Sequence, residues 1–255
     1  MSEHAVLVDV SDGIMTVTLN RPEAKNAANK AVAVGVAAAM DELDSNDDIR
    51  VAILTGAGGT FCSGMDLKAF VSGEVPFVEG RGFAGLTEKS PRKPLIAAVE
   101  GYALAGGLEL AISCDLIVAA NNAKFGIPEV KRGLAAAAGG LIKLPRQIPS
   151  RLAMELALTG DFLEASRALE VGLINQLVEP GTALEAAKAL AAKIAANGPL
   201  AVASSKQVVQ ESFGWSEEEM WEKQQTIVNA VFVSEDAIEG ATAFAQKRAP
   251  NWKGR

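Results

Sequence analysis

The 255-residue sequence predicts an α/β fold with a helical region added at its C-terminal end. Two observations carry this prediction. Apolar runs at 51–56, 95–101 and 116–120 have the length of strands buried on both faces, and helix-like segments lie between them. From Leu141 onwards the pattern is mostly helical. Buried strands that alternate with helices are typical of an α/β core.

The first elements along the chain are a predicted hairpin and a helix. Residues 5–10 and 14–19 are short β-like runs, and the Asp12-Gly13 pair between them is a hairpin signal. Residues 30–43 are rich in alanine and valine, and we expect them to form a helix. The strand at 51–56 follows this helix.

The middle of the chain contains loops between the buried strands. A glycine-rich loop is expected at 56–66, and residues 72–94, with three prolines, are expected to form a mobile loop with one short helix. The segment YALAGGLELAISC (102–114) predicts a strand–turn–helix junction, and LINQLV (173–178) a short strand. We therefore expect a core over residues 1–195 and a helical oligomerisation region over residues 196–255.

Composition excludes several classes of function. The net charge of −7 argues against nucleic-acid binding, which needs a concentrated basic surface. The single histidine, His4, lies near the chain end, so neither a Ser-His-Asp arrangement nor a histidine-ligated metal is expected. Cys62 and Cys114 are too few for a disulfide framework. With no long apolar run and no secretory signal pattern, we expect a cytoplasmic protein without membrane contacts.

Glu109 is the first candidate for chemistry. It is a lone charge among apolar neighbours, two positions after Gly107 of the Gly106-Gly107 pair. A glutamate is rarely buried without a partner, so Glu109 either turns to solvent or pairs with a lysine, or it serves a site. Small residues at a helix start let a ligand approach the backbone N–H groups, and a carboxylate one turn away is placed for acid–base work.

Three other segments carry weaker signals. Ser63 and Cys62 are possible nucleophiles, but no histidine is available to activate them. Residues 56–61 lack the third glycine of a dinucleotide-binding loop. Glu129 follows Pro128 in a loop, where most glutamates are surface residues.

The combination of motifs resembles the enoyl-CoA hydratase/isomerase (crotonase) family. The resemblance rests on GYALAGGLELAISCD followed by FGIPE, which places Glu109 and Glu129 twenty positions apart, and it covers essentially the whole chain. The remaining matching segments are LNRPEAKNA (19–27), residues 55–67 and residues 235–255. Residues 82–88 (GFAGLTE) and the C-terminal segment are also similar to the carnitinyl-CoA dehydratase branch. The resemblance implies a crotonase-type ββα spiral core.

The resemblance also implies a role for particular residues. Glu109 and Glu129 match the two family glutamates that handle water, and Met65 and Gly106 match the two backbone N–H groups of the oxyanion hole. The remaining matches concern coenzyme A or substrate: Ala24, Asp66, Leu67 and Lys68 in the same subunit, and Phe244 and Lys247 reaching the coenzyme A of a neighbouring subunit.

Three departures from the family pattern affect this site. Met65 stands at a position that often holds alanine, and its N–H group survives the change. The usual triple glycine is Ala105-Gly106-Gly107, so the matching oxyanion position is intact. Where the family often has Pro-Gly-Ala-Gly-Gly, this chain has AAAGG (136–140). Ala137 keeps its N–H group but adds a methyl group near the expected water site.

Having both glutamates favours hydration or dehydration of an enoyl-CoA over double-bond isomerisation, and over a non-catalytic acyl-CoA-binding role. We expect no metal and no separate cofactor, because coenzyme A is part of the substrate. The partners are expected to be an acyl-CoA and further copies of the chain, as a trimer or a dimer of trimers. The carnitinyl-CoA branch suggests a quaternary ammonium in the acyl group. With few aromatic residues and an alanine run in the chain, we instead expect a short- or medium-chain enoyl-CoA.

Overall fold

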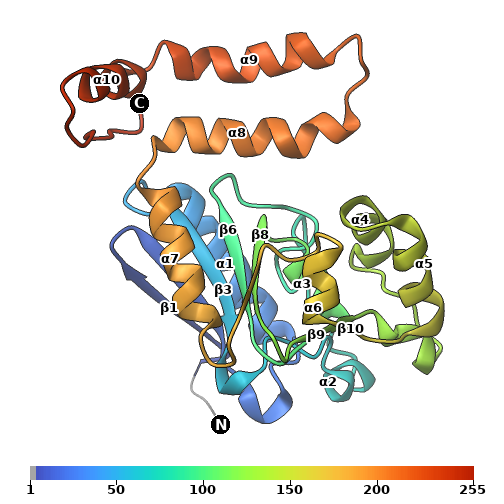
Figure 1. Ribbon diagram of the computed structural model, residues 1–255. Coiled ribbons are helices and arrows are strands. Elements are labelled where there is room, and N and C mark those ends of the chain that lie inside the picture. The colour runs from blue at the N-terminus through green and yellow to red at the C-terminus, as the bar shows by residue number, and fades with distance from the viewer. Residues whose placement is uncertain (1–3) are drawn as a thin grey trace.

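The computed structural model describes residues 4–255, and a six-stranded sheet is the centre of this part of the chain (Figure 1). Its strand order is β1-β2-β3-β6-β8-β11; β1 and β2 form an antiparallel hairpin, and the other neighbours pair in parallel. The bounds are Val6–Ser11 (β1), Ile14–Leu19 (β2), Val51–Gly56 (β3), Leu95–Val99 (β6), Leu116–Ala120 (β8) and Gln176–Val178 (β11). The predicted hairpin and the three predicted buried strands are confirmed.

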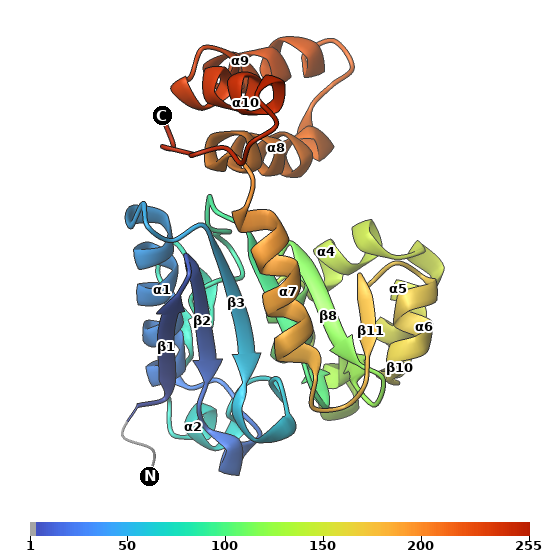
Figure 2. The ribbon, with the colours of Figure 1, turned by 60° about the vertical axis from the view of Figure 1, so that its left-hand side comes forward.

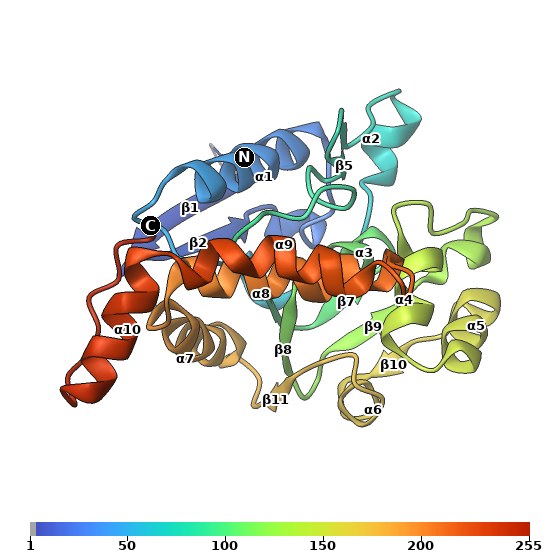
Figure 3. The same ribbon diagram turned by 90° about the horizontal axis from the view of Figure 1, so that it is seen from above.

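Helices cover both faces of this sheet. Helix α1 (Lys30–Ser45) lies on one face and α7 (Ala183–Ala195) on the other, as the view from above shows (Figure 3). Strand β3 explains why both faces are apolar: Val51 and Ile53 pack in one cluster with Ala187 of α7, whereas its alternate residues pack in the cluster that contains α1. The prediction of strands buried on both faces is therefore correct.

Short strands and short helices form a second layer beside the main sheet. A three-stranded sheet, in the order β10-β9-β7, consists of Leu163–Glu164, Lys124–Gly126 and Tyr102–Leu104. The short helices near it are α2 (Leu67–Val71), α3 (Gly106–Ala111), α4 (Gly140–Gln147), α5 (Ser150–Thr159), α6 (Ala165–Glu170) and the 3₁₀ turns η1 (Pro22–Ala24), η2 (Ala57–Gly59) and η3 (Pro128–Arg132). The predicted strand–turn–helix junction is β7 followed by α3.

The segment 72–94 differs from its prediction. It holds a small hairpin of β4 (Phe77–Val78) and β5 (Gly82–Phe83) instead of a helix, and residues 81–87 are buried. Gly80, Gly82 and Gly85 have positive φ angles, which turn the chain repeatedly and leave no room for a helical run. The short helix expected here lies earlier, at α2.

The C-terminal helices project from one end of the core (Figures 1 and 2). They are α8 (Pro199–Glu211), the turn η4 (Ser212–Gly214), α9 (Met220–Phe232) and α10 (Glu235–Ala245). The side chain of Lys206 on α8 is 8% exposed and its Nζ lies 2.7 Å from Asp115 Oδ2, which attaches this region to the start of β8. The division at residue 195 stays a prediction. Among residues 4–255 no helix has the length and apolar character needed to cross a membrane.

Candidate active site

The start of α3 is a tightly packed turn. A Cβ atom on Gly107 would lie 2.0 Å from the carbonyl oxygen of Cys62, and one on Gly106 would lie 2.5 Å from the ring of Phe83. Only glycine fits such contacts. The preceding Ala105 has φ 53° and ψ −129°. This conformation is energetically unfavourable for any residue that has a side chain. The sequence GG therefore brings the first turn of α3 against the loop at 60–66.

Two backbone N–H groups without a protein acceptor in the described part of the chain, those of Met65 and Gly106, lie on the two sides of this contact. Met65 lies between Gly64, whose oxygen accepts from Ala28 N, and Asp66, whose N–H donates to Ala28 O. A Cβ on Gly64 would lie 3.3 Å from Gly106 N, so the two segments touch. Among the residues that the structure describes, neither Met65 N nor Gly106 N donates to a protein oxygen. Both donors are available to an anionic or carbonyl oxygen.

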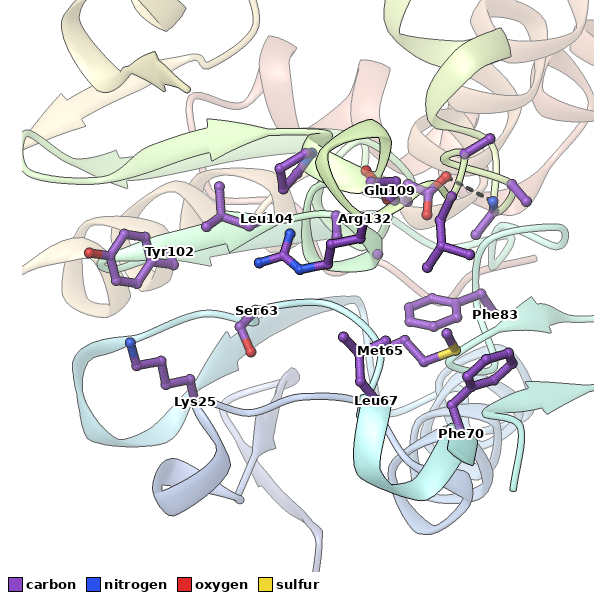
Figure 4. A pocket seen from close by; sticks show the side chains of 18 of the residues that line it. Lys25, Ser63, Met65, Leu67, Phe70, Phe83, Tyr102, Leu104, Glu109 and Arg132 are labelled. Atoms are coloured by element: carbon purple, nitrogen blue, oxygen red, sulfur yellow. Dashed lines mark hydrogen bonds between the residues drawn. The ribbon is translucent and has the colours of Figure 1, made fainter. Parts of the chain in front are cut away.

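Met65 and Gly106 line a cavity of about 630 Å³. Glu109 and Glu129 line the same cavity, so the structure brings together all four residues proposed for the reaction. Figure 4 shows the side chains of Met65, Phe70 and Phe83 gathered on one side of it, with Lys25, Ser63 and Tyr102 on the other. The further apolar lining comes from Leu67, Val75, Phe77, Leu104, Leu134, Ala135, Ala137, Ala138 and Phe162.

Glu109 is held by the start of α4. Glu109 is 3% exposed, and its Oε1 accepts hydrogen bonds from Ala138 N and Gly140 N, both at 2.8 Å. Figure 4 shows the first of these two bonds as a dashed line. Burial raises the pKa of Glu109, and these N–H groups together with the Lys143 cation oppose that shift. The carboxylate is therefore fixed in direction and supported by donors in its ionised form.

Glu129 has a different environment. It lies in η3, and its Oε2 is buried without a hydrogen-bond partner among the residues described. Burial, with a further contribution from the neighbouring Glu109 carboxylate, raises the pKa of Glu129 to about 7, against the opposing effect of Arg132. Two carboxyl groups in one cavity thus have unequal environments, which is the arrangement that separates an acid from a base.

The other predicted binding residues are not all in the cavity. Leu67 lines it, whereas Asp66 caps α2 by accepting from Lys68 N and Ala69 N and pairs with Arg21 at 2.8 Å. Ala24 and Lys68 lie outside the lining, although both are in segments next to it. The departure at Ala137 falls where expected, because this residue lines the cavity close to the N–H groups that hold Glu109.

Phe244 and Lys247 lie far from the cavity of their own subunit. They are at the end of α10, and Figures 1 and 3 show α10 at the opposite end of the molecule from α2. The side chain of Phe244 is 88% exposed. Contact of these residues with a neighbouring subunit's ligand stays a prediction.

Several cavity residues were missed by the sequence analysis. Lys25 lies with its Nζ 5.3 Å from the ring centre of Tyr102, and Figure 4 shows the Arg132 side chain pointing into the cavity between Leu104 and Ser63. Of these residues, only Arg132 could have been suspected from the sequence, because it follows Glu129 by three positions. Phe77 also lines the cavity, with its ring centre 5.7 Å from that of Phe83.

The fold and the cavity, whose lining holds two carboxyl groups and two backbone N–H groups left unpaired by the residues described, define an enzyme class that comparison with known proteins identifies. The chain belongs to the enoyl-CoA hydratase/isomerase family, which it matches over residues 9–255. This confirms the crotonase-type fold.

Three relatives illustrate the match. The chain is 44% identical to the enoyl-CoA hydratase EchA19 of Mycobacterium tuberculosis, over 98% of this chain and 96% of the relative. It is 41% identical to a carnitinyl-CoA dehydratase of Salmonella typhi, over 95% of each. A crystal structure of an enoyl-CoA hydratase from Mycobacterium tuberculosis H37Rv has a TM-score of 0.98 at 62% identity, over 99% of this chain and 100% of that one.

Proposed function

We propose that the protein is an enoyl-CoA hydratase, which adds water across the C2–C3 double bond of a 2-enoyl-CoA or catalyses the reverse dehydration. The observation that carries the proposal is the meeting of four groups in one cavity: the Glu109 and Glu129 carboxyls and the unpaired N–H groups of Met65 and Gly106. Both named relatives of hydratase type and the family match support it.

The two N–H groups serve the thioester oxygen. Addition of water at C3 pushes electron density onto this oxygen and gives an enolate-like state. Donors fixed by the packing of Gly106 and Gly107 need no reorganisation when the charge forms, and one such donor is worth about 3–4 kcal/mol of barrier height. The close contacts of Gly106 and Gly107 therefore hold the donors in position for the developing negative charge.

The unequal environments of the glutamates assign their roles. Glu109, with two N–H donors on Oε1, acts as the base that takes a proton from water as the water oxygen bonds to C3. Glu129, with its pKa raised to about 7, delivers its proton to C2. At the end of the reaction Glu109 holds a proton that Glu129 lacks, and a proton transfer within this coupled pair restores the starting state. This chemistry requires no metal and no separate cofactor.

Hydration of crotonyl-CoA, followed by loss of the conjugated thioester absorbance, tests the proposal. General acid–base groups contribute about 10²–10⁴-fold, so Glu109→Gln and Glu129→Gln should each lose at least the lower figure. Circular dichroism checks that both variants fold, and Glu155→Gln on α5 is the matched surface control. Near-normal turnover in either active-site variant would refute the assignment.

Carnitinyl-CoA dehydration is the second candidate, and one observation favours it. Phe70, Phe77 and Phe83 line the cavity together, with the rings of Phe77 and Phe83 5.7 Å apart and edge to face, so aromatic surfaces for a quaternary ammonium are present. The cations Lys25 and Arg132 in the same cavity oppose this candidate, because they repel a charged trimethylammonium group.

A trimer or a dimer of trimers is part of the proposal. Exposed apolar side chains of the C-terminal region support it: Trp221 is 70% exposed, Phe232 74% and Phe244 88%, more than a monomer surface normally leaves open. Static light scattering should give at least three times the 26.5 kDa of one chain, and a monomer at micromolar concentration would refute it. We also place the enzyme in the cytoplasm, since both cysteines are buried free thiols, which suits a reducing compartment.

A further inference from the structure

Lys143 connects three segments that surround Glu109. It lies on α4, and its Nζ donates to the carbonyl oxygen of Thr87 at 2.6 Å and to Ser113 Oγ at 2.8 Å. Thr87 belongs to the buried stretch that follows β5, and Ser113 follows α3. One side chain thus ties α4, the end of α3 and the loop at 81–88 together.

Both partners of Lys143 also make a hydrogen bond to a residue of the active site. Ser113 Oγ donates to the carbonyl oxygen of Glu109 at 2.7 Å, one turn back along the chain. Thr87 Oγ1 accepts from Phe83 N at 3.0 Å, and the Phe83 ring is the group that a Cβ on Gly106 would strike. Lys143 therefore supports both the backbone of Glu109 and the segment of Phe83, whose ring lies against Gly106.

The charge of Lys143 also acts on the site. Burial lowers the pKa of Lys143, whereas the facing groups Cys114, Glu109 and Glu88 favour its charged form. Burial raises the pKa of the Cys114 thiol, so this group stays neutral beside Lys143. In turn, the ammonium opposes the effect of burial on the pKa of Glu109, and the Arg132 guanidinium acts in the same direction on the raised pKa of Glu129.

We propose that Lys143 is a positioning residue for the reaction: it fixes α3, α4 and the 81–88 loop around Glu109, and it places a positive charge near the carboxyl that takes a proton from water. This inference rests on the role proposed above for Glu109. Lys143 does not line the cavity, so it acts through Glu109 and Phe83 and not on the substrate.

Two substitutions separate the charge from the packing. Lys143→Met keeps the length of the side chain and removes both donors and the charge, whereas Lys143→Arg keeps the charge. Misplacement of a reacting group can cost up to about 100-fold, so we expect Lys143→Met to lower kcat by about 10- to 100-fold with a much smaller change in KM. Lys143→Arg should recover part of this loss. Lys188→Met, at an exposed lysine of α7, is the matched control and should leave kcat unchanged.

A titration that needs no turnover completes the test. In a Glu129→Gln background, ¹³C NMR of labelled glutamates, with Glu109→Gln used to assign the signal, reports the pKa of Glu109. We expect Lys143→Met to raise this pKa and Lys143→Arg to return it towards the starting value. An unchanged pKa and unchanged kcat, with only a lower melting temperature, would show a purely structural role and overturn the inference. Failure of the parent enzyme to hydrate any enoyl-CoA would instead refute the proposed function, and the titration would still test Lys143.

Discussion

The backbone N–H of Gly140 donates to Oε1 of Glu109 at 2.8 Å, so the first residue of α4 directly orients the proposed base. A side chain on Gly140 would be crowded, because a Cβ there would lie 3.1 Å from Glu109 Oε1 and 3.1 Å from the Cβ of Ala136, so the carboxylate would have to move by a few tenths of an ångström. The donor and the absence of a side chain serve the same purpose: they let α4 approach the carboxylate.

The first prediction follows from this contact. Gly140→Ala should push the Glu109 carboxylate away from its two donors and lower kcat by about 10- to 100-fold, the range expected when a reacting group is displaced. Ala138→Gly keeps the second donor N–H and adds no atoms, so it is the matched control. Steady-state kinetics with crotonyl-CoA measure both. A Gly140→Ala enzyme with the parent's kcat would contradict the role of this contact.

The second prediction concerns pH and Glu129. Its folded-state pKa of about 7 lies above the ordinary 4.5, so the proton that Glu129 delivers is lost as pH rises, and kcat/KM should fall through about pH 7. The same raised pKa contributes stability that is fully present below about 4.5 and is lost as pH rises through about 7. In Glu129→Gln this pH dependence of stability should flatten, as denaturant titrations at several pH values will show. A kcat/KM that rises through pH 7 would reverse the assigned roles.

The third prediction concerns Ala105, which stands where the family often has glycine. Its φ of 53° and ψ of −129° cost about 1–3 kcal/mol for a residue with a side chain, whereas glycine adopts them freely and adds about 0.5–1 kcal/mol of unfolding entropy. Ala105→Gly should therefore stabilise the fold by about 1 kcal/mol and leave the Gly106 donor in place. Ala38→Gly, at an exposed site inside α1, should destabilise by about 1 kcal/mol in the same denaturation assay. Destabilisation by Ala105→Gly as well would show that no strain is stored at this turn.

The main sheet and the carboxylates could be predicted from the sequence, whereas the contacts that organise the site could not. The strand at 51–56 is a continuous apolar run with its own signal, and the family motif names Glu109 and Glu129 directly. The donors to Glu109 come from 29 and 31 residues away, and Lys143 meets Thr87 across 56 residues. A periodic pattern of apolar residues reports only local structure, so it gives no indication of these long-range hydrogen bonds.

The second sheet and the contact between Phe77 and Phe83 could not be predicted for a related reason. Strands β9 and β10 have three residues and two residues, too few to show an alternating pattern. Phe70, Phe77 and Phe83 are spread over a stretch whose glycines hide any period, and only the folded chain brings them into one cavity. Asp66, which the motif match suggested for substrate, is engaged by Arg21 and by the start of α2.

The fourth prediction concerns Lys247 and the neighbouring subunit. Lys247 follows α10 and lies away from its own cavity, so a contact with coenzyme A requires the assembly. As a point charge for a phosphate it contributes binding that is equal in the ground state and the transition state. Lys247→Ala should raise KM for acyl-CoA with little change in kcat. Lys193→Ala, at an exposed lysine of α7, should change neither value, and an unchanged KM in Lys247→Ala would mean that Lys247 is an ordinary solvated lysine.

The last prediction concerns the acyl group. Three phenylalanines could receive a quaternary ammonium, with each cation–π contact worth about 0.5–2 kcal/mol. The same cavity contains Lys25 and Arg132, whereas its carboxyl groups are the two engaged in proton transfer. A trimethylammonium group would therefore meet like charge without a free counter-ion, and we expect crotonyl-CoA to be preferred over crotonobetainyl-CoA. The comparison of kcat/KM for the two substrates under one set of conditions decides it. Arg132→Leu is the informative variant, because removal of a repulsive charge should reduce the difference in kcat/KM between crotonyl-CoA and crotonobetainyl-CoA. A preference of about tenfold for the betaine, roughly 1.4 kcal/mol, would instead assign the enzyme to carnitine chemistry.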